Sequence, residues 1–183
     1  MKTTLLLALL PCLAVAQDGP RPPAFLLVGS PSPVQAAPNP KIDYPGFVKA
    51  AESLETVRAA NRISEDDFLR MMAEPKTVVL DARSQAKFDE MHVKGAIHLD
   101  LTDFNAPALE KLIPDKTTRI LIYCNNNFQG AERSFPSKAV QVALNVQTFI
   151  NLHTYGYKNV KELAPLIEIS KVKLPMEGTE IRK

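Results

Sequence analysis

The sequence predicts an α/β fold in which a mostly parallel sheet is covered by helices on both faces. One observation predicts this fold, and a second places a candidate site on it. Short apolar runs of β-favouring residues alternate with segments of helical periodicity, which is the pattern of parallel strands joined by helical crossovers. One such run, residues 119–123, leads directly into Cys124 and a polar turn. Ligands of parallel sheets bind beyond the carboxyl ends of the strands, so this turn is a candidate site.

Four elements are expected between residues 47 and 90. Apolar residues at helical spacing predict a helix over 47–60. A second helix is expected to begin at Ser64, because Asp67 three residues later completes a pattern similar to a capping box. The apolar run at 77–81 predicts a buried strand, and a short helix is expected over 84–90.

The chain after residue 90 continues the alternation. The remaining patterns predict, in chain order, a strand at 96–99, a helix at 108–113, strands at 119–123 and 159–162, and a short helix at 163–167. A longer helix is expected to begin at about Pro136, since proline suits the first turn of a helix. Gly156 suits the C-cap of that helix.

The N-terminus has the architecture of an export signal. A basic start is followed by an apolar run from Leu5 to Leu13 and a small-x-small cleavage site that ends at Ala16. The run is too short to span a bilayer as a helix. We expect residues 1–16 to be a signal peptide and the processed protein to be periplasmic or secreted, with no transmembrane segment; an uncleaved N-terminal anchor is the alternative.

Proline dominates the next segment, residues 17–45. Because proline fixes φ and removes a backbone donor, this segment is expected to be an extended tether. A helical extension over 46–62, the domain itself over 63–170 and a C-terminal tail over 171–183 follow. The chain has 183 residues, 45% of them hydrophobic, and a formal net charge of only +2, so no nucleic-acid partner is expected.

Cys124 is the most informative residue. The other cysteine, Cys12, lies in the predicted signal peptide, so the processed chain has one thiol and no partner for an internal disulfide. An odd cysteine in an exported protein indicates a reactive thiol or an intermolecular pairing. His98 and His153 have no partner at metal-ligand spacing, so no metal is expected.

Several motifs together resemble the rhodanese domain family. They are, in chain order, Asp81-Ala82-Arg83, Phe88, His92-Val93-Lys94-Gly95-Ala96-Ile97, Tyr123-Cys124 and Gly156-Tyr157-Lys158-Asn159-Val160. The resemblance implies a three-layer rhodanese-like fold and a sulfurtransferase that needs no cofactor. It implies that the Cys124 thiolate takes sulfur from a small donor such as thiosulfate and passes it to a thiol or to cyanide. Whether a protein partner is involved stays open.

The cysteine loop departs from the family pattern. The family has C-x-x-x-x-R before a helix, whereas this chain has Gln129 in the arginine position and reaches its first arginine at Arg133. The substrate-binding candidates are the loop residues Asn125, Asn126, Asn127, Phe128, Gln129 and Arg133. The asparagines either line the pocket or cap their own turn, Phe128 either covers the pocket or anchors the loop, and Arg133 either folds over the pocket or stays beside Glu132.

The resemblance gives three further residues a supporting role. Asp81 and Arg83 are expected to hold the strand edge by ion pairing, and His92 is expected to be structural rather than a catalytic base. The missing loop arginine keeps a second function open, in which the fold is a non-catalytic binding or redox-sensing module. A phosphatase or arsenate reductase is disfavoured, because Gly130 stands where their loop needs arginine.

Overall fold

The computed structural model describes residues 39–181. The predicted signal peptide and residues 17–38 of the proline-rich tether therefore lie outside the described residues. A compact unit begins at Lys41. Within the described part of the chain, no helix is both long and apolar enough to cross a membrane.

A parallel five-stranded sheet forms the centre of this unit, in the order β1-β7-β5-β2-β4. Its strands are β1 (Arg62–Ile63), β7 (Val160–Leu163), β5 (Arg119–Tyr123), β2 (Thr77–Asp81) and β4 (Ile97–His98). Two short ladders lie beside it: β3 (His92–Val93) pairs antiparallel with β9 (Met176–Glu177), and β6 (Phe128–Gln129) pairs parallel with β8 (Ile167–Glu168). The mostly parallel α/β sheet predicted from the sequence is confirmed.

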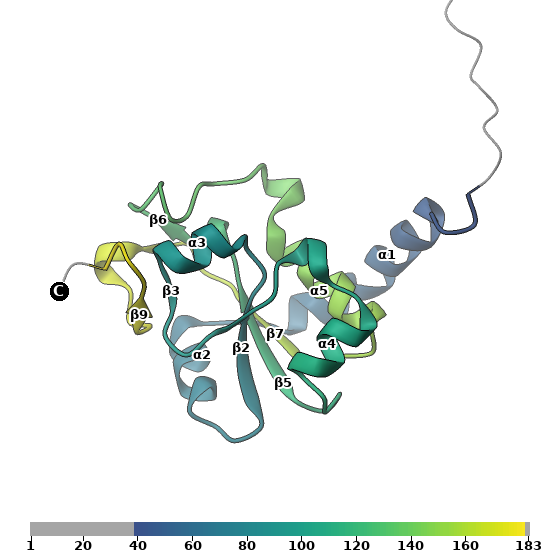
Figure 1. Ribbon diagram of the computed structural model, residues 1–183, viewed down its shortest axis with the longest axis horizontal. Helices are drawn as coiled ribbons and strands as arrows, with labels where there is room; N and C mark the ends of the chain where they lie inside the picture. The colour runs from purple at the N-terminus through teal and green to yellow at the C-terminus, as the bar shows by residue number, and fades with distance from the viewer. Residues whose placement is uncertain (1–38, 182–183) are drawn as a thin grey trace, which may run out of the picture. The chain divides into compact units, whose positions relative to one another are not determined.

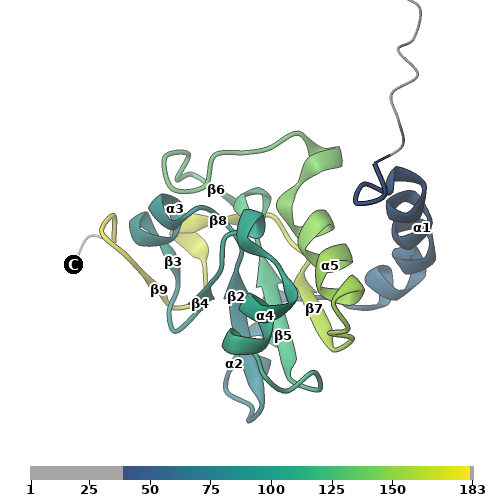
Figure 2. The same cartoon turned by 45° about the vertical axis from the view of Figure 1, so that its right-hand side comes forward.

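Helices cover both faces of the sheet (Figures 1 and 2). They are α1 (Tyr44–Ala60), α2 (Glu65–Met72), α3 (Gln85–Glu90), α4 (Ala106–Leu112) and α5 (Leu144–Thr154). Side chains alternate between the two faces of a strand: Leu121 of β5 packs with Phe68 of α2, whereas Ile122 packs with Leu109 of α4 and Phe149 of α5. The sheet is therefore the middle of three layers.

Local capping explains where several helices begin. Ser64 Oγ accepts a hydrogen bond from the Asp67 backbone N–H at 3.1 Å and donates one to the Asp67 carboxylate at 2.8 Å, so the predicted cap is confirmed. Asp43 and Asn105 accept backbone N–H bonds at the starts of α1 and α4. Each cap satisfies one of the donors that the first turn of a helix leaves unpaired.

Two expected helices are wrong. The helix expected from about Pro136 begins only at Leu144, after an irregular segment and a short 3₁₀ turn, η3 (Val140–Val142). Asn126 holds this segment at Lys138, where its side chain bonds the backbone N–H and the carbonyl. The helix expected at 163–167 is instead the end of β7 and the start of β8. Pro165 disfavours helical backbone in the residue before it, and buried Ile167 pairs with β6.

Candidate active site

Cys124 follows β5 directly and starts the 3₁₀ turn η2 (Asn125–Asn127). Cys124 is only 1% exposed, yet this residue lines a cavity of about 320 Å³ at the carboxyl end of the sheet. The other polar residues that line this cavity are Arg58, Arg62, Asn126, Asn127, Asn145 and Glu162. They come from α1, β1, the cysteine turn, α5 and β7, so the cavity is assembled from segments far apart in the sequence.

Opposing effects act on the Cys124 thiol. Burial raises its pKa, because an apolar environment disfavours the thiolate. Backbone N–H groups of Asn145, Asn126 and Leu144 lower the pKa, whereas the negative charge of Glu162 raises it; the net result is a pKa above the ordinary value. Two of the three N–H groups belong to the first turn of α5, whose N-terminus favours negative charge.

Asn127 holds the cysteine turn in place. Its Oδ1 accepts the Cys124 backbone N–H at 2.8 Å and the Asn145 side-chain amide at 2.9 Å. Its own amide donates to the carbonyls of Leu163 at 2.8 Å and Pro165 at 3.1 Å. All of these contacts fix the turn against α5 and the end of β7, so Asn127 positions the thiol in addition to lining the cavity.

The two neighbouring asparagines, Asn125 and Asn126, differ in their contacts. Asn126 lines the cavity and ties the turn to Lys138 through two hydrogen bonds of 2.8 and 3.0 Å. Asn125 is buried, and its Oδ1 has no hydrogen-bond partner among residues 39–181. Asn125 is not among the residues that line the cavity of Cys124.

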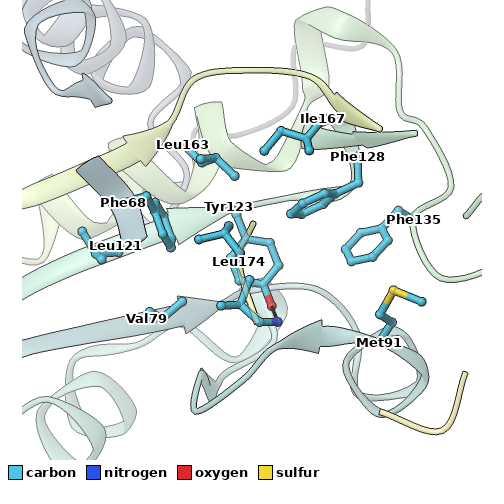
Figure 3. Close-up of a cluster of buried hydrophobic side chains, with 11 residues drawn as sticks. Phe68, Val79, Met91, Leu121, Tyr123, Phe128, Phe135, Leu163, Ile167 and Leu174 are labelled. Atoms are coloured by element: carbon cyan, nitrogen blue, oxygen red, sulfur yellow. Dashed lines mark hydrogen bonds between the residues drawn. The ribbon is translucent and has the colours of Figure 1, made fainter. Parts of the chain in front are cut away.

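The rest of the loop leads away from this cavity. Phe128 is buried in a hydrophobic cluster, with its ring edge-on to Tyr123 and 4.5 Å from the Phe135 ring (Figure 3). Gln129 is exposed and pairs with Glu168 of β8. Arg133 is 71% exposed and forms ion pairs with two glutamates outside the cavity, Glu90 and Glu180. None of these three loop residues is among those that line the cavity.

Asp81 and Arg83 form a buried ion pair of 2.6 Å beside the core. Arg83 also donates to the carbonyls of Ser134 at 2.9 Å and Met91 at 2.7 Å, and Tyr123 donates to Asp81 at 2.5 Å. Burial and the adjacent carboxylate hold the pKa of Tyr123 well above its usual value. This network joins β2, β5, the end of α3 and the cysteine loop, and its residues do not line the cavity of Cys124.

His92 is held in the ladder of β3 and β9. Its Nδ1 lies 2.6 Å from the Phe88 carbonyl, its Nε2 lies 3.2 Å from Glu177, and its ring stacks on Phe88 at 3.7 Å. His92 does not line the cavity. Across residues 39–181, no group of three or more histidine, cysteine, aspartate or glutamate side chains is placed to hold a metal ion.

Sequence reasoning missed three charged residues of the cavity. Glu162 lies in β7, 4% exposed at its side chain, and pairs with Arg58 at 2.6 Å and more loosely with Arg62 at 3.7 Å. The sequence held one signal for such a pair, because a glutamate in a predicted buried strand needs a cationic partner. The sequence could not identify that partner, since Arg58 is 104 residues away in the chain.

Comparison with known proteins gives a family match at domain level. The model of the rhodanese-like domain family matches residues 64–164, which is more than half of the 183 residues. No curated protein is significantly similar to the chain.

Three of the solved structures that match the chain are from Anabaena, Bacillus halodurans and Pseudomonas aeruginosa. The rhodanese-like domain of an Anabaena protein is 18% identical, with a TM-score of 0.47, over 66% of this chain and 80% of that chain. A Bacillus halodurans protein is 17% identical, with a TM-score of 0.48, over 73% and 88% of the two chains. A thiosulfate sulfurtransferase from Pseudomonas aeruginosa is 22% identical, with a TM-score of 0.46, over 72% of this chain and 23% of that chain.

The family match runs from the cap of α2 to the end of β7, so it includes four strands of the sheet, β2, β4, β5 and β7, together with the cysteine turn that the motifs predicted. On the strength of this match, the chain belongs to the family of rhodanese-like domains.

Proposed function

We propose that this protein is a sulfurtransferase that carries sulfane sulfur as a persulfide on Cys124. One observation carries the proposal: a single thiol at the end of β5 lines a cavity whose wall holds backbone N–H groups and two arginines. A thiolate nucleophile needs stabilisation of negative charge and space for its substrate. Those two requirements meet at this cavity.

The proposed reaction has two displacement steps. The Cys124 thiolate attacks the outer sulfur of a donor such as thiosulfate; a new sulfur–sulfur bond forms, the bond inside thiosulfate breaks, and sulfite leaves with the bonding electrons. An acceptor thiolate or cyanide then attacks the terminal sulfur of the persulfide, and the Cys124 thiolate is regenerated. The backbone N–H groups at the start of α5 are positioned to stabilise the anionic sulfur in both steps.

Loading with sulfur is the direct test. The full-length protein, carrying Cys12→Ser so that Cys124 is its one cysteine, is incubated with thiosulfate, and its mass is measured under non-reducing conditions. We expect Cys124 to gain one sulfur atom, and we expect thiocyanate to appear when cyanide is added. Cys124→Ser should abolish both signals, because with Cys12 already replaced no cysteine is left in the chain.

Arg133→Gln is a matched control, since Arg133 lies outside the cavity. That variant should load sulfur like the parent protein. Turnover that persists in Cys124→Ser at the parental rate would refute the role of Cys124.

A second function is favoured by one observation, the burial of the Cys124 thiol and its raised pKa. A protonated, shielded thiol is a weak nucleophile, which suits a non-catalytic binding module, whereas a redox sensor needs a more exposed thiolate. The mass measurement separates the two functions. Sulfur on Cys124 of the protein isolated from its native compartment supports sulfur transfer, whereas oxygen adducts alone support redox sensing.

A further inference from the structure

Positive charge reaches the cavity of Cys124 from outside the cysteine loop. Arg58 lies in the last turn of α1 and Arg62 begins β1, and both line the cavity. The family match starts only at residue 64. Both arginines therefore belong to the segment that precedes the matched domain.

The loop itself contributes no cation to this cavity. Gln129 stands in the position of the family arginine and is exposed in β6, and Arg133 is engaged by Glu90 and Glu180. The lining residues contain two cations, Arg58 and Arg62. Among residues 39–181, a negatively charged sulfur donor that enters the cavity thus meets cations only from α1 and β1.

Arg58 and Arg62 differ in how closely they pair with Glu162. Arg58 lies 2.6 Å from Glu162 Oε1 and is 28% exposed at its side chain. Arg62 lies 3.7 Å from the same oxygen, is 46% exposed, and donates a hydrogen bond to the Ala164 carbonyl at 3.2 Å. The second oxygen of Glu162 has no partner within the described part of the chain. The charge of Arg58 is therefore largely neutralised by Glu162, while Arg62 keeps more of its charge available for an anionic ligand.

Two arginines against one glutamate leave a single net positive charge on the wall. Once Cys124 ionises, that charge is balanced by the thiolate. A dianionic donor then receives less electrostatic stabilisation from the wall than it would receive from two arginines without Glu162. The Glu162 carboxylate also repels it. A monoanionic donor of similar size meets less of this repulsion.

We propose that Arg58 and Arg62, supplied by the segment before the domain, replace the missing loop arginine as the anion-binding residues of the sulfur donor site. Glu162 attenuates their charge, so the site favours compact monoanionic sulfane-sulfur donors over dianionic ones. This inference rests on the proposed sulfur transfer for its substrate class, and on the geometry of the cavity for its residues.

The first experiment measures the charge at the cavity without any sulfur chemistry. Cys124 of the full-length protein, in which Cys12→Ser leaves it as the one cysteine, is alkylated with iodoacetate and with iodoacetamide, which differ in charge and react with the same thiolate. The ratio of the two rates reports the local potential. Arg62→Gln should lower the iodoacetate to iodoacetamide ratio about threefold or more, and Glu162→Gln should raise it by a similar factor. Arg133→Gln should leave it unchanged.

Arg58 needs a separate variant, because its removal leaves the Glu162 carboxylate without its closest partner. The double variant Arg58→Gln with Glu162→Gln removes both charges together and avoids an unpaired buried carboxylate. Compared with Glu162→Gln alone, this double variant should show a lower alkylation ratio. Equal ratios in the two variants would exclude Arg58 from the site.

The second experiment compares donors. Methanethiosulfonate is a monoanion that delivers its outer sulfur and leaves as methanesulfinate, whereas thiosulfate is a dianion. Arg62→Gln should raise the KM of both donors roughly tenfold, as expected when a charge-assisted contact is lost. Glu162→Gln should raise kcat/KM for thiosulfate more than for methanethiosulfonate.

The outcomes separate the two proposals. If neither donor loads Cys124 in the parent protein, sulfur transfer is refuted, whatever the alkylation ratios show. If the parent protein loads sulfur but Arg62→Gln changes neither the alkylation ratio nor KM, the assignment of the arginines is overturned. A parent protein that prefers thiosulfate over methanethiosulfonate, with no change in Glu162→Gln, overturns the attenuating role of Glu162.

Discussion

Cys124 combines two properties that oppose each other. A nucleophile needs the thiolate, whereas burial favours the protonated thiol and raises the pKa of this residue. The N–H groups of Asn145, Asn126 and Leu144 reduce that effect without cancelling it. At neutral pH the resting residue is therefore mainly a thiol, and its reactivity is limited by the fraction that ionises.

This balance predicts a rising pH profile. The rate of alkylation of Cys124 by iodoacetamide should increase with pH, with a midpoint above the ordinary cysteine value of about 8.5, because the folded protein shifts the pKa upward. The measurement is a series of alkylation rates on the intact protein. A midpoint at or below the ordinary value would contradict the buried environment of the thiol.

One substitution isolates the contribution of α5 to that midpoint. Leu144 is the first residue of α5, where proline is well tolerated, and Ala143 before it has an extended backbone, with φ of −54° and ψ of 133°. Leu144→Pro removes one N–H donor from the sulfur and should move the midpoint further upward. Leu144→Ala is the matched control, since it shortens the side chain and keeps the N–H.

The elements of the fold are joined by the Asp81–Arg83 network rather than by the sheet alone. The 2.6 Å ion pair is fully buried, and the Arg83 guanidinium lies 4.3 Å from the centre of the Phe135 ring. Arg83 also bonds the carbonyls of Met91 and Ser134. These contacts fasten the end of α3 and the cysteine loop to β2, so the motif supports the site from a distance.

Breaking this pair should act on stability. Asp81→Ala and Arg83→Ala each leave an uncompensated buried charge, which typically costs about 3–5 kcal/mol of unfolding free energy. Urea or thermal melts give the change in stability, and sulfur loading of the protein that remains folded gives the activity. Arg70→Gln, which breaks only exposed ion pairs, should change stability little. A full loss of activity at unchanged stability would move Asp81 and Arg83 into the site.

At the scale of the whole molecule, we predict that the protein is exported and processed. The basic start, the apolar run and the cleavage site at Ala16 favour removal of residues 1–16. Intact mass and N-terminal sequencing of the protein from its native host should show a chain that begins near Gln17 and has lost Cys12. An exported protein that retains Met1 would contradict this prediction.

Much of the fold could be predicted because it depends on sequence patterns within single elements. The apolar runs that became β2 and β5, the cap at Ser64 and the cysteine at the end of a strand all depend on residues that are close in sequence. The start of α5 could not be located in the same way. Pro136 suits a helix start on its own, but the contact between Asn126 and Lys138 holds that segment outside the helix.

The sequence by itself determined the α/β fold, the family and the thiol that the site is built around. Only the tertiary structure decided which charged groups surround that thiol. Arg58 and Glu162 lie 104 residues apart in the chain and meet because β1 pairs with β7, which brings the end of α1 beside the cysteine turn. The same assembly buries Phe128 and leaves Gln129 and Arg133 outside the cavity. Local patterns specify elements, whereas the composition of a cavity depends on contacts between elements, and these form only when the sheet is assembled.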